Sequence, residues 1–383
     1  MTLTRFVTKS AFRNKRRSLL TVLSITFSLL LLTLMMTIWH TFYIDQGDAE
    51  SAQRLITRHR VSLTESMPSF YREKIRALPG VVAVVPNDWF GGIYKDAKPE
   101  NFFAQFGTDP EELLKVFTDF KLPPDQLLAW QRDRAGVIAD SGLARKFGWN
   151  LGDRVVLKGT IYPVDLELTI RGLYTAPIPT QSVYFNQKYV EEAVSFAKGK
   201  AGTFDILTDS PQSVSAVASA VDNMFRNSPE PTKTESEKAF QLSFINSIGN
   251  VKAFILSICF AVVFATLLVS ATTMAMSIRE RTREVAVLKT LGFTRRLILR
   301  LYIGEAVLVG LTGGALGCLL ALALVSALRH APGMVLFLSG LKVTPATLLL
   351  AIFVAGMVGV LSALLPAYHA AKLDMVEGLR YIG

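Results

Sequence analysis

Cysteine is scarce in this sequence, with two residues among 383, at positions 259 and 318. Both lie inside long apolar runs. The large polar region that precedes them in the sequence contains no cysteine, so no disulfide can hold it together. Histidine is also scarce, and none of the four histidines is spaced from a Cys, a Glu or a second His as metal ligands are. These absences exclude a disulfide scaffold and predict that the chain has no metal site.

Motifs for nucleotide binding and catalysis are missing as well. The chain has no G-x-x-x-x-G-K-[ST] phosphate loop and no G-x-S-x-G nucleophile elbow. The paired acids Glu111-Glu112 and Glu191-Glu192 are interpreted as solvated helix faces. The sequence therefore predicts no catalytic residue and no cofactor bound by this chain.

Long apolar runs are what the sequence has in abundance, since half of its residues are hydrophobic. A membrane-spanning helix needs about 20 apolar residues, and four stretches meet that length: residues 19–40, 254–278, 301–328 and 347–369. The first is too long for a signal-peptide core and is interpreted as an uncleaved anchor. We expect an α-helical membrane protein with four transmembrane helices and a large extracytoplasmic α+β domain between the first and second.

The basic residues predict the orientation. Residues 1–18 hold six basic and no acidic side chains, and residues 279–300 hold seven basic and two acidic ones. Because cytoplasmic segments of membrane proteins are enriched in Lys and Arg, both termini are expected in the cytoplasm and the large domain in the periplasm or outside. The chain is therefore expected in the cell inner membrane. The basic cytoplasmic segments account for its high isoelectric point, so no nucleic-acid partner is needed to explain it.

The extracytoplasmic region mixes expected strands and helices. Strands are expected at 58–65, 81–86 and 203–209, with helices at 69–80 and 211–225, which suggests one split α/β subdomain. A second subdomain is expected inside it, with a strand at 102–109, a helix opening at 110–117 and antiparallel strands over 135–159 and 165–174. Apolar residues at three- or four-residue spacing before the second long run predict a helical stalk there, and the alternative is an ordinary pair of juxtamembrane linkers.

The expected organisation follows from these patterns. Its parts are a basic N-terminal segment (1–18), a first span (19–40), a stalk (41–57), a split subdomain (58–94 and 201–235) with an insert (95–200), a second stalk (236–253), a second span (254–278), a cytoplasmic loop (279–300), a third span (301–328), a short external loop (329–346), a fourth span (347–369) and a cytoplasmic tail (370–383).

The cytoplasmic loop is predicted to hold a short amphipathic helix that begins near Arg279. Val285, Leu288 and Leu291 form an apolar stripe at three-residue spacing, and Gly292 is well placed to end the helix. Thr294 can cap the helix that follows. An apolar stripe on a solvent-facing loop requires a surface to bury it, either lipid headgroups or a protein groove.

Two further features lie in the third run. Glu305 either snorkels toward the cytoplasmic boundary or joins a helix–helix hydrogen bond or relay. Four glycines form two overlapping GxxxG pairs that favour close intramembrane packing, within the chain or between two subunits; they are Gly310, Gly313, Gly314 and Gly317.

The loop and the third run together resemble a known family. RERTREVAVLKTLGFTRRLILRLYIGEAVLVGLTGGALG, from Arg279, is similar to the hallmark region of ABC-transporter permeases of the macrolide-exporter (MacB) and FtsX-like family, the type VII or mechanotransmission class. The ending LLPAYHAAKLDMVEGLRY resembles the same family, as does AGVIADSGLARKFG with GDRV and TIRGLY in the external region. The resemblance covers nearly the whole chain.

The resemblance implies that the loop helix is a coupling helix that contacts an ATPase. The matching residues are Arg281, Arg283, Glu284, Val285, Leu288, Lys289 and Gly292. It also implies a homodimer or a heterodimer with a related permease, and ATP and Mg on a separate ATPase subunit, with or without a periplasmic adaptor protein. In this family the split part is called the porter subdomain and the insert the sabre subdomain. A stand-alone permease without a fused ATPase domain is expected, itself not an enzyme.

Several functions fit this picture. The first is export or extraction of a hydrophobic or amphipathic cargo, including lipoprotein release. The second is mechanotransmission to an envelope partner, as in FtsX-like permeases. A membrane ligand sensor is the alternative of another class, but a sensor would carry a larger cytoplasmic output domain than the short segments at the two ends of this sequence.

Overall fold

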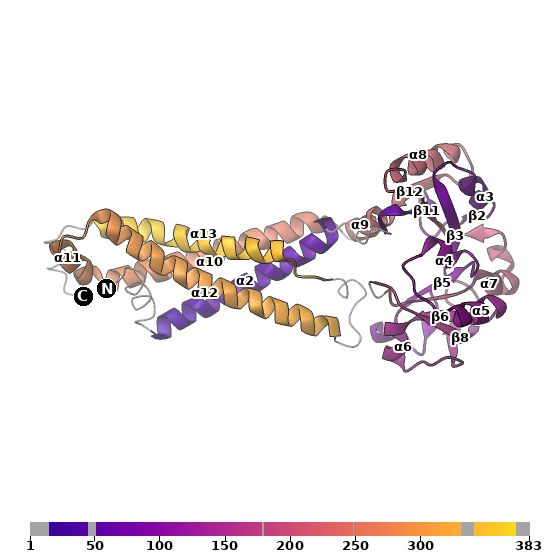
Figure 1. Ribbon diagram of the computed structural model, residues 1–383, viewed down its shortest axis with the longest axis horizontal. Coiled ribbons are helices and arrows are strands. Elements are labelled where there is room, and N and C mark those ends of the chain that lie inside the picture. The colour runs from indigo at the N-terminus through magenta and orange to yellow at the C-terminus, as the bar shows by residue number, and fades with distance from the viewer. Residues whose placement is uncertain (1–14, 45–50, 178–179, 248, 331–340, 373–383) are drawn as a thin grey trace. The chain divides into compact units, whose positions relative to one another are not determined.

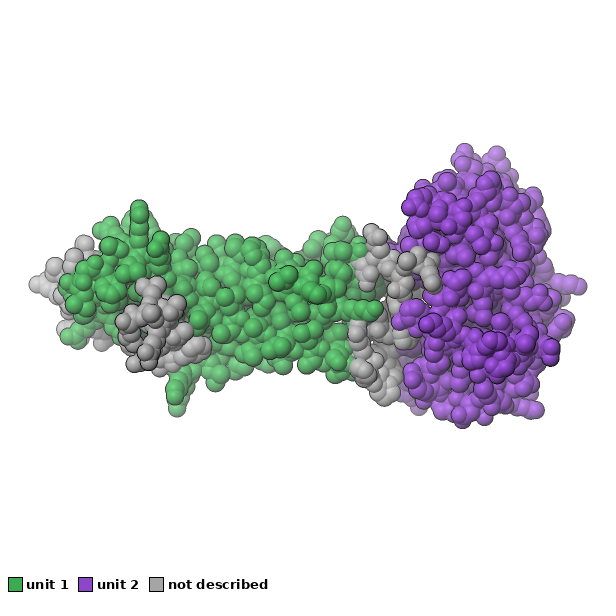
Figure 2. Space-filling view, viewed as in Figure 1, with its two compact units in different colours: residues 1–44, 250–330, 341–383 green, residues 45–249, 331–340 purple. Residues whose placement is uncertain are grey.

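The chain folds into two compact units (Figure 2). The computed structural model describes residues 15–44, 51–177, 180–247, 249–330 and 341–372. Residues 1–44, 250–330 and 341–383 form the helical unit, and residues 45–249 with 331–340 form the α/β unit. Most of the expected N-terminal segment, external loop and cytoplasmic tail lie outside the described residues.

The helical unit carries the four expected spans (Figure 1). Its elements are α2 (Lys15–Trp39), the π-helix η1 (His40–Ile44), α10 (Val251–Glu280), α11 (Thr282–Thr290), α12 (Arg295–His330) and α13 (Pro345–Lys372). Four helical stretches are long and apolar enough to cross a membrane: Lys15–Ile44, Val251–Glu280, Arg295–Leu328 and Pro345–Lys372. The prediction of four membrane helices is confirmed.

Helix α12 packs along both α13 and α2, and its glycines lie at these contacts. A Cβ on Gly310 would lie 2.7 Å from the carbonyl O of Ala355 in α13, and a Cβ on Gly314 would lie 2.6 Å from the Cβ of the same residue. On the other face, a Cβ on Gly313 would lie 2.7 Å from Ile25 in α2, and one on Gly317 would lie 2.7 Å from the carbonyl O of Thr26. Small residues allow such close backbone approach in lipid. The two GxxxG pairs therefore pack against helices of the same chain.

Polar side chains add specific links between the packed helices. Ser270 of α10 donates a buried hydrogen bond of 3.0 Å to Ser362 of α13. Arg17 of α2 lies 2.5 Å from the carboxylate of Glu280 and donates to Ser277 at 2.7 Å, both in α10. The buried bond between Ser270 and Ser362 fixes the register of α10 against α13, because lipid offers these hydroxyl groups no alternative partner.

The α/β unit is built on one ten-stranded sheet. Its elements are η2 (Ser51–Gln53), β1 (Arg54–His59), β2 (Met67–Pro68), α3 (Tyr71–Arg76), β3 (Val81–Trp89), β4 (Ile93–Tyr94), η3 (Pro99–Asn101), β5 (Ala104–Thr108), α4 (Leu113–Val116), α5 (Pro124–Arg132), β6 (Gly136–Asp140), α6 (Ser141–Phe147), β7 (Arg154–Lys158), β8 (Leu166–Tyr174), β9 (Ser182–Asn186), α7 (Gln187–Ala193), η4 (Ser195–Ala197), β10 (Lys200–Ala201), β11 (Thr203–Thr208), α8 (Val214–Met224), β12 (Thr232–Ser236) and α9 (Glu237–Ser247). The strand order is β12-β1-β11-β3-β5-β9-β6-β8-β7-β4.

The first four strands in that order form a split βαβ arrangement. β11 is antiparallel to both β1 and β3, and β1 is antiparallel to β12, with α3 following β1 and α8 following β11. This is the topology of a ferredoxin-like unit, interrupted between its second and third strands. Leu55, Ile75, Phe204 and Val221 are fully buried between its sheet and helices.

The inserted strands continue the same sheet, which sequence patterns did not predict. The last three residues of β3 pair with β5, from Asn87 opposite Thr108 to Trp89 opposite Phe106. β7 and β8 are antiparallel as expected, but β6 and β8 are parallel. The expectation of antiparallel strands throughout 135–159 is wrong, because Ser141–Phe147 form helix α6 and because β6 is antiparallel to β9 but parallel to β8.

Two further expectations differ at the edges of elements. The strand expected at 58–65 is β1, which ends at His59. The helical stretch expected at 236–253 is two helices, because α9 ends at Ser247, Gly249 has φ of 140° and α10 begins at Val251. A positive φ is accessible to glycine at little cost. Residues 45–50 and 248 of the two stretches read as stalks lie outside the described residues.

Strand β11 carries a buried acid. Asp205 of β11 is 7% exposed and accepts a hydrogen bond from the Asn87 side chain of β3. Burial, together with the nearby carboxylate of Glu237, raises the pKa of Asp205 to about 7, although the Asn87 hydrogen bond and the guanidinium of Arg54 act in the opposite direction. The folded α/β unit therefore holds this proton far more tightly than an unfolded chain does.

We expect Gly314→Ala to destabilise the helical unit by about 1–3 kcal/mol, because the new Cβ would lie 2.6 Å from that of Ala355. The matched control is Gly356→Ala in α13, where the nearest atom, in Leu311, is 3.8 Å away. Unfolding of the purified chain is followed with a thiol-reactive dye, since both cysteines are buried in the helical unit. Equal unfolding temperatures for the two variants would contradict the close packing of α12 on α13.

We expect Asp205→Asn to stabilise the α/β unit increasingly as pH rises. Below about pH 4 the carboxyl is protonated in both the folded and the unfolded chain. Between pH 4 and the folded pKa of about 7, the wild-type free energy of unfolding falls by up to about 1.4 kcal/mol per pH unit. The loss is complete above pH 7, and the amide variant lacks it.

Urea unfolding of the full chain in nanodiscs measures this effect through tryptophan emission. Three of the four tryptophans lie in the α/β unit: Trp89, Trp130 and Trp149. The control is Asp209→Asn, because hydrogen bonds from Ser213 and Ser210 lower the pKa of that exposed carboxyl. A gain in stability of the Asp205 variant that is the same at pH 5 and pH 8 would refute the assignment.

Candidate functional site

The short helix α11 lies between α10 and α12 at one end of the helical unit. Arg281 caps α10, and its carbonyl O accepts the first bond of α11 from Val285 at 3.0 Å. The helix ends as predicted: Gly292 has φ of 87° and donates to the carbonyl O of Lys289, while Phe293 donates to that of Leu288. This pair of bonds is a Schellman motif, which favours glycine. Thr294 then accepts the first backbone bonds of α12.

The inner face of α11 is packed into the helical unit. Val285 and Ala286 are 1% and 2% exposed. Val285 lies in an apolar cluster with residues of α10, α12 and α13: Ile278, Ile298, Tyr302, Ala367, Ala370 and Ala371. Val285 is therefore part of the packed core and does not belong to an outward stripe.

A buried ion pair ties the start of α11 to α12. Nη1 of the Arg281 guanidinium lies 3.1 Å from Oε2 and 3.3 Å from Oε1 of Glu305, and both side chains are almost fully buried. The interpretation of Glu305 as a snorkelling residue is wrong, and the helix–helix link is the one observed. Removing one partner of such a pair leaves an uncompensated buried charge, so the two residues depend on each other.

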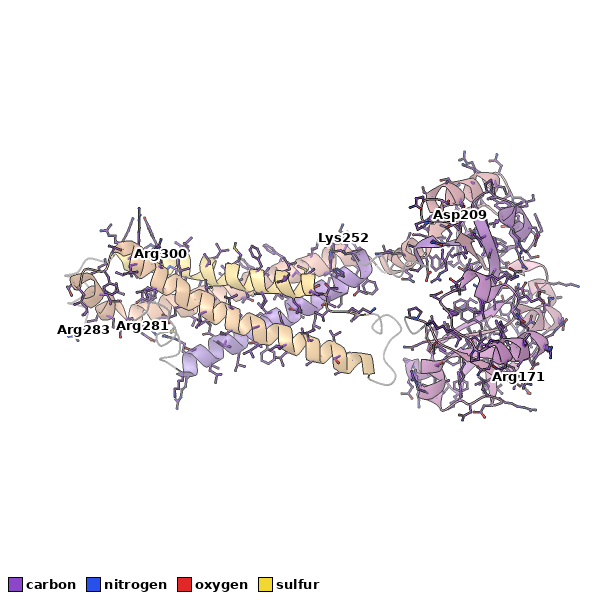
Figure 3. All side chains as sticks on the ribbon, in the orientation of Figure 1. Arg171, Asp209, Lys252, Arg281, Arg283 and Arg300 are labelled. Carbon is purple, nitrogen blue, oxygen red and sulfur yellow. The ribbon has the colours of Figure 1, made fainter. Side chains whose placement is uncertain are left out.

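The outer face of α11 carries a different stripe from the one expected. Arg283, Val287 and Leu291 recur at four-residue spacing, and Val287 and Leu291 are 44% and 70% exposed. Glu284 is also exposed, while Leu288 and Lys289 are half-buried. At 100° per residue, Val287 and Leu291 point away from Val285. Figure 3 labels Arg281, Arg283 and Arg300 at this end of the helical unit and Lys252 toward the other.

The sequence-predicted site residues thus fall into three groups. Arg281 and Val285 lie inside the helical unit, Arg283 and Glu284 lie on the surface, and Leu288 and Lys289 lie between. The four packing glycines are in α12 and line contacts with α2 and α13. Among the described residues, no group of three or more His, Cys, Asp or Glu side chains could hold a metal ion.

Arg54 is a second organising residue, which the sequence patterns did not single out. It is the first residue of β1, it is 4% exposed, and its guanidinium lies 2.5 Å from Asp119 and 2.8 Å from Glu237, the first residue of α9. It also lies over the ring of Phe117 at 5.0 Å. Burial acts against the charge, but the carboxylates of Glu237 and Asp119 raise the pKa of Arg54 above its usual value.

This contact joins both ends of the α/β unit. Along the chain, β1 is the first strand after α2, and α9 is the last helix before α10. Arg54 therefore holds the entry and the exit of the unit together, and its bond to Asp119 adds the inserted region to the same contact.

Glu112 is not a solvated acid as expected: it is 6% exposed and lies within 4 Å of Arg72, Arg76 and Lys115.

Comparison with known proteins gives matches over both units. Residues 18–224, more than half of the chain, match the MacB-like periplasmic core domain, and residues 254–375 match the FtsX-like permease C-terminal region. An uncharacterised ABC transporter permease of Methanocaldococcus jannaschii is 24% identical over an alignment of 396 positions, which covers 98% of this chain and 96% of that protein.

A shorter match is closer in sequence. The macrolide export ATP-binding/permease protein MacB of Escherichia coli strain K12 is 40% identical over 108 residues, and the match covers 28% of this chain and 16% of that protein. Among solved structures, the periplasmic region of MacB from Actinobacillus actinomycetemcomitans is 12% identical, with a TM-score of 0.37, and covers 51% of this chain and 93% of that one.

We expect Glu305→Ala to loosen the start of α11, with a cost of about 3–5 kcal/mol, because it removes the carboxylate that lies 3.1 Å from the buried guanidinium of Arg281. The double variant Arg281→Met with Glu305→Leu removes both charges and is expected to recover most of that loss. Hydrogen exchange over residues 282–290 in nanodiscs measures the effect. Slow exchange in the single variant, or exchange in the double variant as fast as in the single, would show that the ion pair does not fix α11.

Proposed function

The chain belongs to the family of ABC transporter permeases that join a MacB-like periplasmic core domain to an FtsX-like permease region, and from that premise we propose that it transmits the motion of a separate ATPase subunit to its α/β unit. The ATPase docks on the outer face of α11. ATP and Mg bind to the ATPase and drive its movement, and this chain contributes no catalytic residue.

The outer face of α11 is the single observation that carries the proposal. Val287 and Leu291 are exposed apolar side chains on a helix whose neighbours are charged, and Arg283 and Glu284 flank them. Apolar residues surrounded by charges are typical of a docking surface, because burial supplies affinity and the charges supply orientation. A helix placed in a protein groove uses anchors at this four-residue spacing.

The ion pair and the apolar core support transmission through α11. A force applied to the outer face reaches α12 through Arg281 and Glu305, and α13 through Val285. At the other end of the spans, the chain continues from α2 into β1 and from α9 into α10. Since Arg54 joins β1 to α9, relative movement of the two connections acts on one point of the α/β unit.

The remaining features of the assembly follow from the same proposal. The basic segment 1–18 and the loop 279–300 lie in the cytoplasm, which puts both termini there and the α/β unit outside the inner membrane. Two permease subunits, either identical or related, assemble with two ATPase subunits, and a periplasmic adaptor contacts the α/β unit. The cargo is a hydrophobic or amphipathic molecule that is exported or extracted from the membrane.

We expect Val287→Asp and Leu291→Asp each to weaken association with the ATPase at least tenfold, because each puts a charge where an apolar contact forms. Thr294→Asp is the matched control: it adds the same charge on the same loop, at an N-cap position where aspartate is favoured. The measurements are co-purification with the ATPase encoded in the same host and ATP hydrolysis by the complex in nanodiscs.

The thiol-dye unfolding temperature verifies that each variant is folded. Wild-type association and hydrolysis in both folded aspartate variants would refute docking on this face. Equal loss in the Thr294 control would show that the effect is one of loop charge and that α11 is not the contact.

A further inference from the structure

A groove opens on the helical unit beside the inner edge of α11. It has a volume of about 350 Å3 and lies among α10, α11 and α13. Its apolar wall includes Ile278, Val285, Leu365 and Ala370, and Arg279 and His369 are its basic residues. This groove is distinct from the outer face of α11, since Val285 rather than Val287 or Leu291 lines it.

Arg279 is the charged residue of the groove that is available to bind a ligand. Its side chain is exposed, and no carboxylate among the described residues forms an ion pair with it. The acidic residue next to it, Glu280, already lies 2.5 Å from Arg17. The guanidinium of Arg279 therefore has its donors free for an anion, and a planar guanidinium matches a phosphate group well.

The position of the groove identifies what covers it. Helices α10 and α13 are membrane spans that end at Glu280 and Lys372, and Arg279 and His369 lie within the last turn of each. A groove at the end of two spans meets the headgroups of one leaflet, and the apolar residues above meet its acyl chains. The ammonium of Lys372, 4.5 Å from the ring of Tyr368, adds positive charge at the same level.

We propose that this groove binds one anionic phospholipid, with the phosphate on Arg279 and part of an acyl chain along Leu365 and Ala370. Charge complementarity selects an anionic headgroup over a zwitterionic one, and the apolar wall selects a lipid over a free phosphate. Val285 of α11 and Pro366 of α13 both line the groove. The bound lipid therefore contacts both of these helices. The inference rests on the membrane spans and not on ATPase docking.

Native mass spectrometry of the delipidated full chain tests the proposal, with an equimolar mixture of dioleoylphosphatidylglycerol and dioleoylphosphatidylcholine as the probe. We expect the first bound lipid to be phosphatidylglycerol with a preference of at least fivefold. Arg279→Gln should abolish that preference. Arg300→Gln, which removes an exposed cation of α12 at the same end of the helical unit (Figure 3), should keep it.

A second variant separates the groove from simple surface charge. Ala275→Phe fills the groove, where Ala275 is a wall residue, and keeps every basic side chain, so it should also lose the first lipid. The thiol-dye unfolding temperature verifies that each variant is folded.

Several outcomes would overturn the site. Equal loss in the Arg279 and Arg300 variants, or unchanged binding in the Ala275 variant, would reduce the effect to general attraction between charges. A chain lacking residues 373–383 is expected to bind as the wild type does. If the lipid binds only after that deletion, the C-terminal tail is the occupant of the groove and the proposal is wrong.

Discussion

The ion pair between Arg281 and Glu305 is the interaction on which the cytoplasmic end of the helical unit depends. Both charges are almost fully buried, in a region where lipid and packed apolar side chains offer no solvation. A charge in such surroundings is stable only beside its counterion. The position of α11 is therefore set by a pairwise requirement and not by the loop sequence alone. Val285 and the Schellman motif at Gly292 then fix the rotation and the length of the helix that this pair anchors.

Sequence patterns predicted most of the architecture because the strongest physical signals are local. Four long apolar runs predicted the four long helices of the helical unit, and the alternation of strand and helix on either side of the insert predicted the split α/β subdomain. Sequence patterns did not predict the parallel pairing of β6 with β8, although helix α6 between β6 and β7 has capping residues at both ends. Asp140 caps α6 by accepting a bond from Gly142, and Gly148 ends it with φ of 72°. The strand-like residues on both sides outweighed these caps.

The candidate site was predicted only in part, and the reason is again physical. The existence of α11 and its glycine stop follow from residues close in sequence. Which face of α11 is buried depends on its packing against α12 and α13. The three-residue spacing from Val285 to Leu291 predicted one apolar stripe, but in the structure Val285 is buried and Leu291 is exposed. The burial of Arg281 depends on a carboxylate 24 residues away, and Arg54 depends on partners 65 and 183 residues away. No local pattern contains such information.

Strand β3 has a consequence for how the α/β unit can respond to force. Over most of its length β3 pairs with β11, and its last three residues pair with β5. One unbroken strand thus belongs to both the ferredoxin-like part and the insert, and swinging the insert about a hinge would require breaking the ladder between β3 and β5. The ferredoxin-like part and the insert are therefore expected to rotate together as one body, because one continuous sheet runs through both.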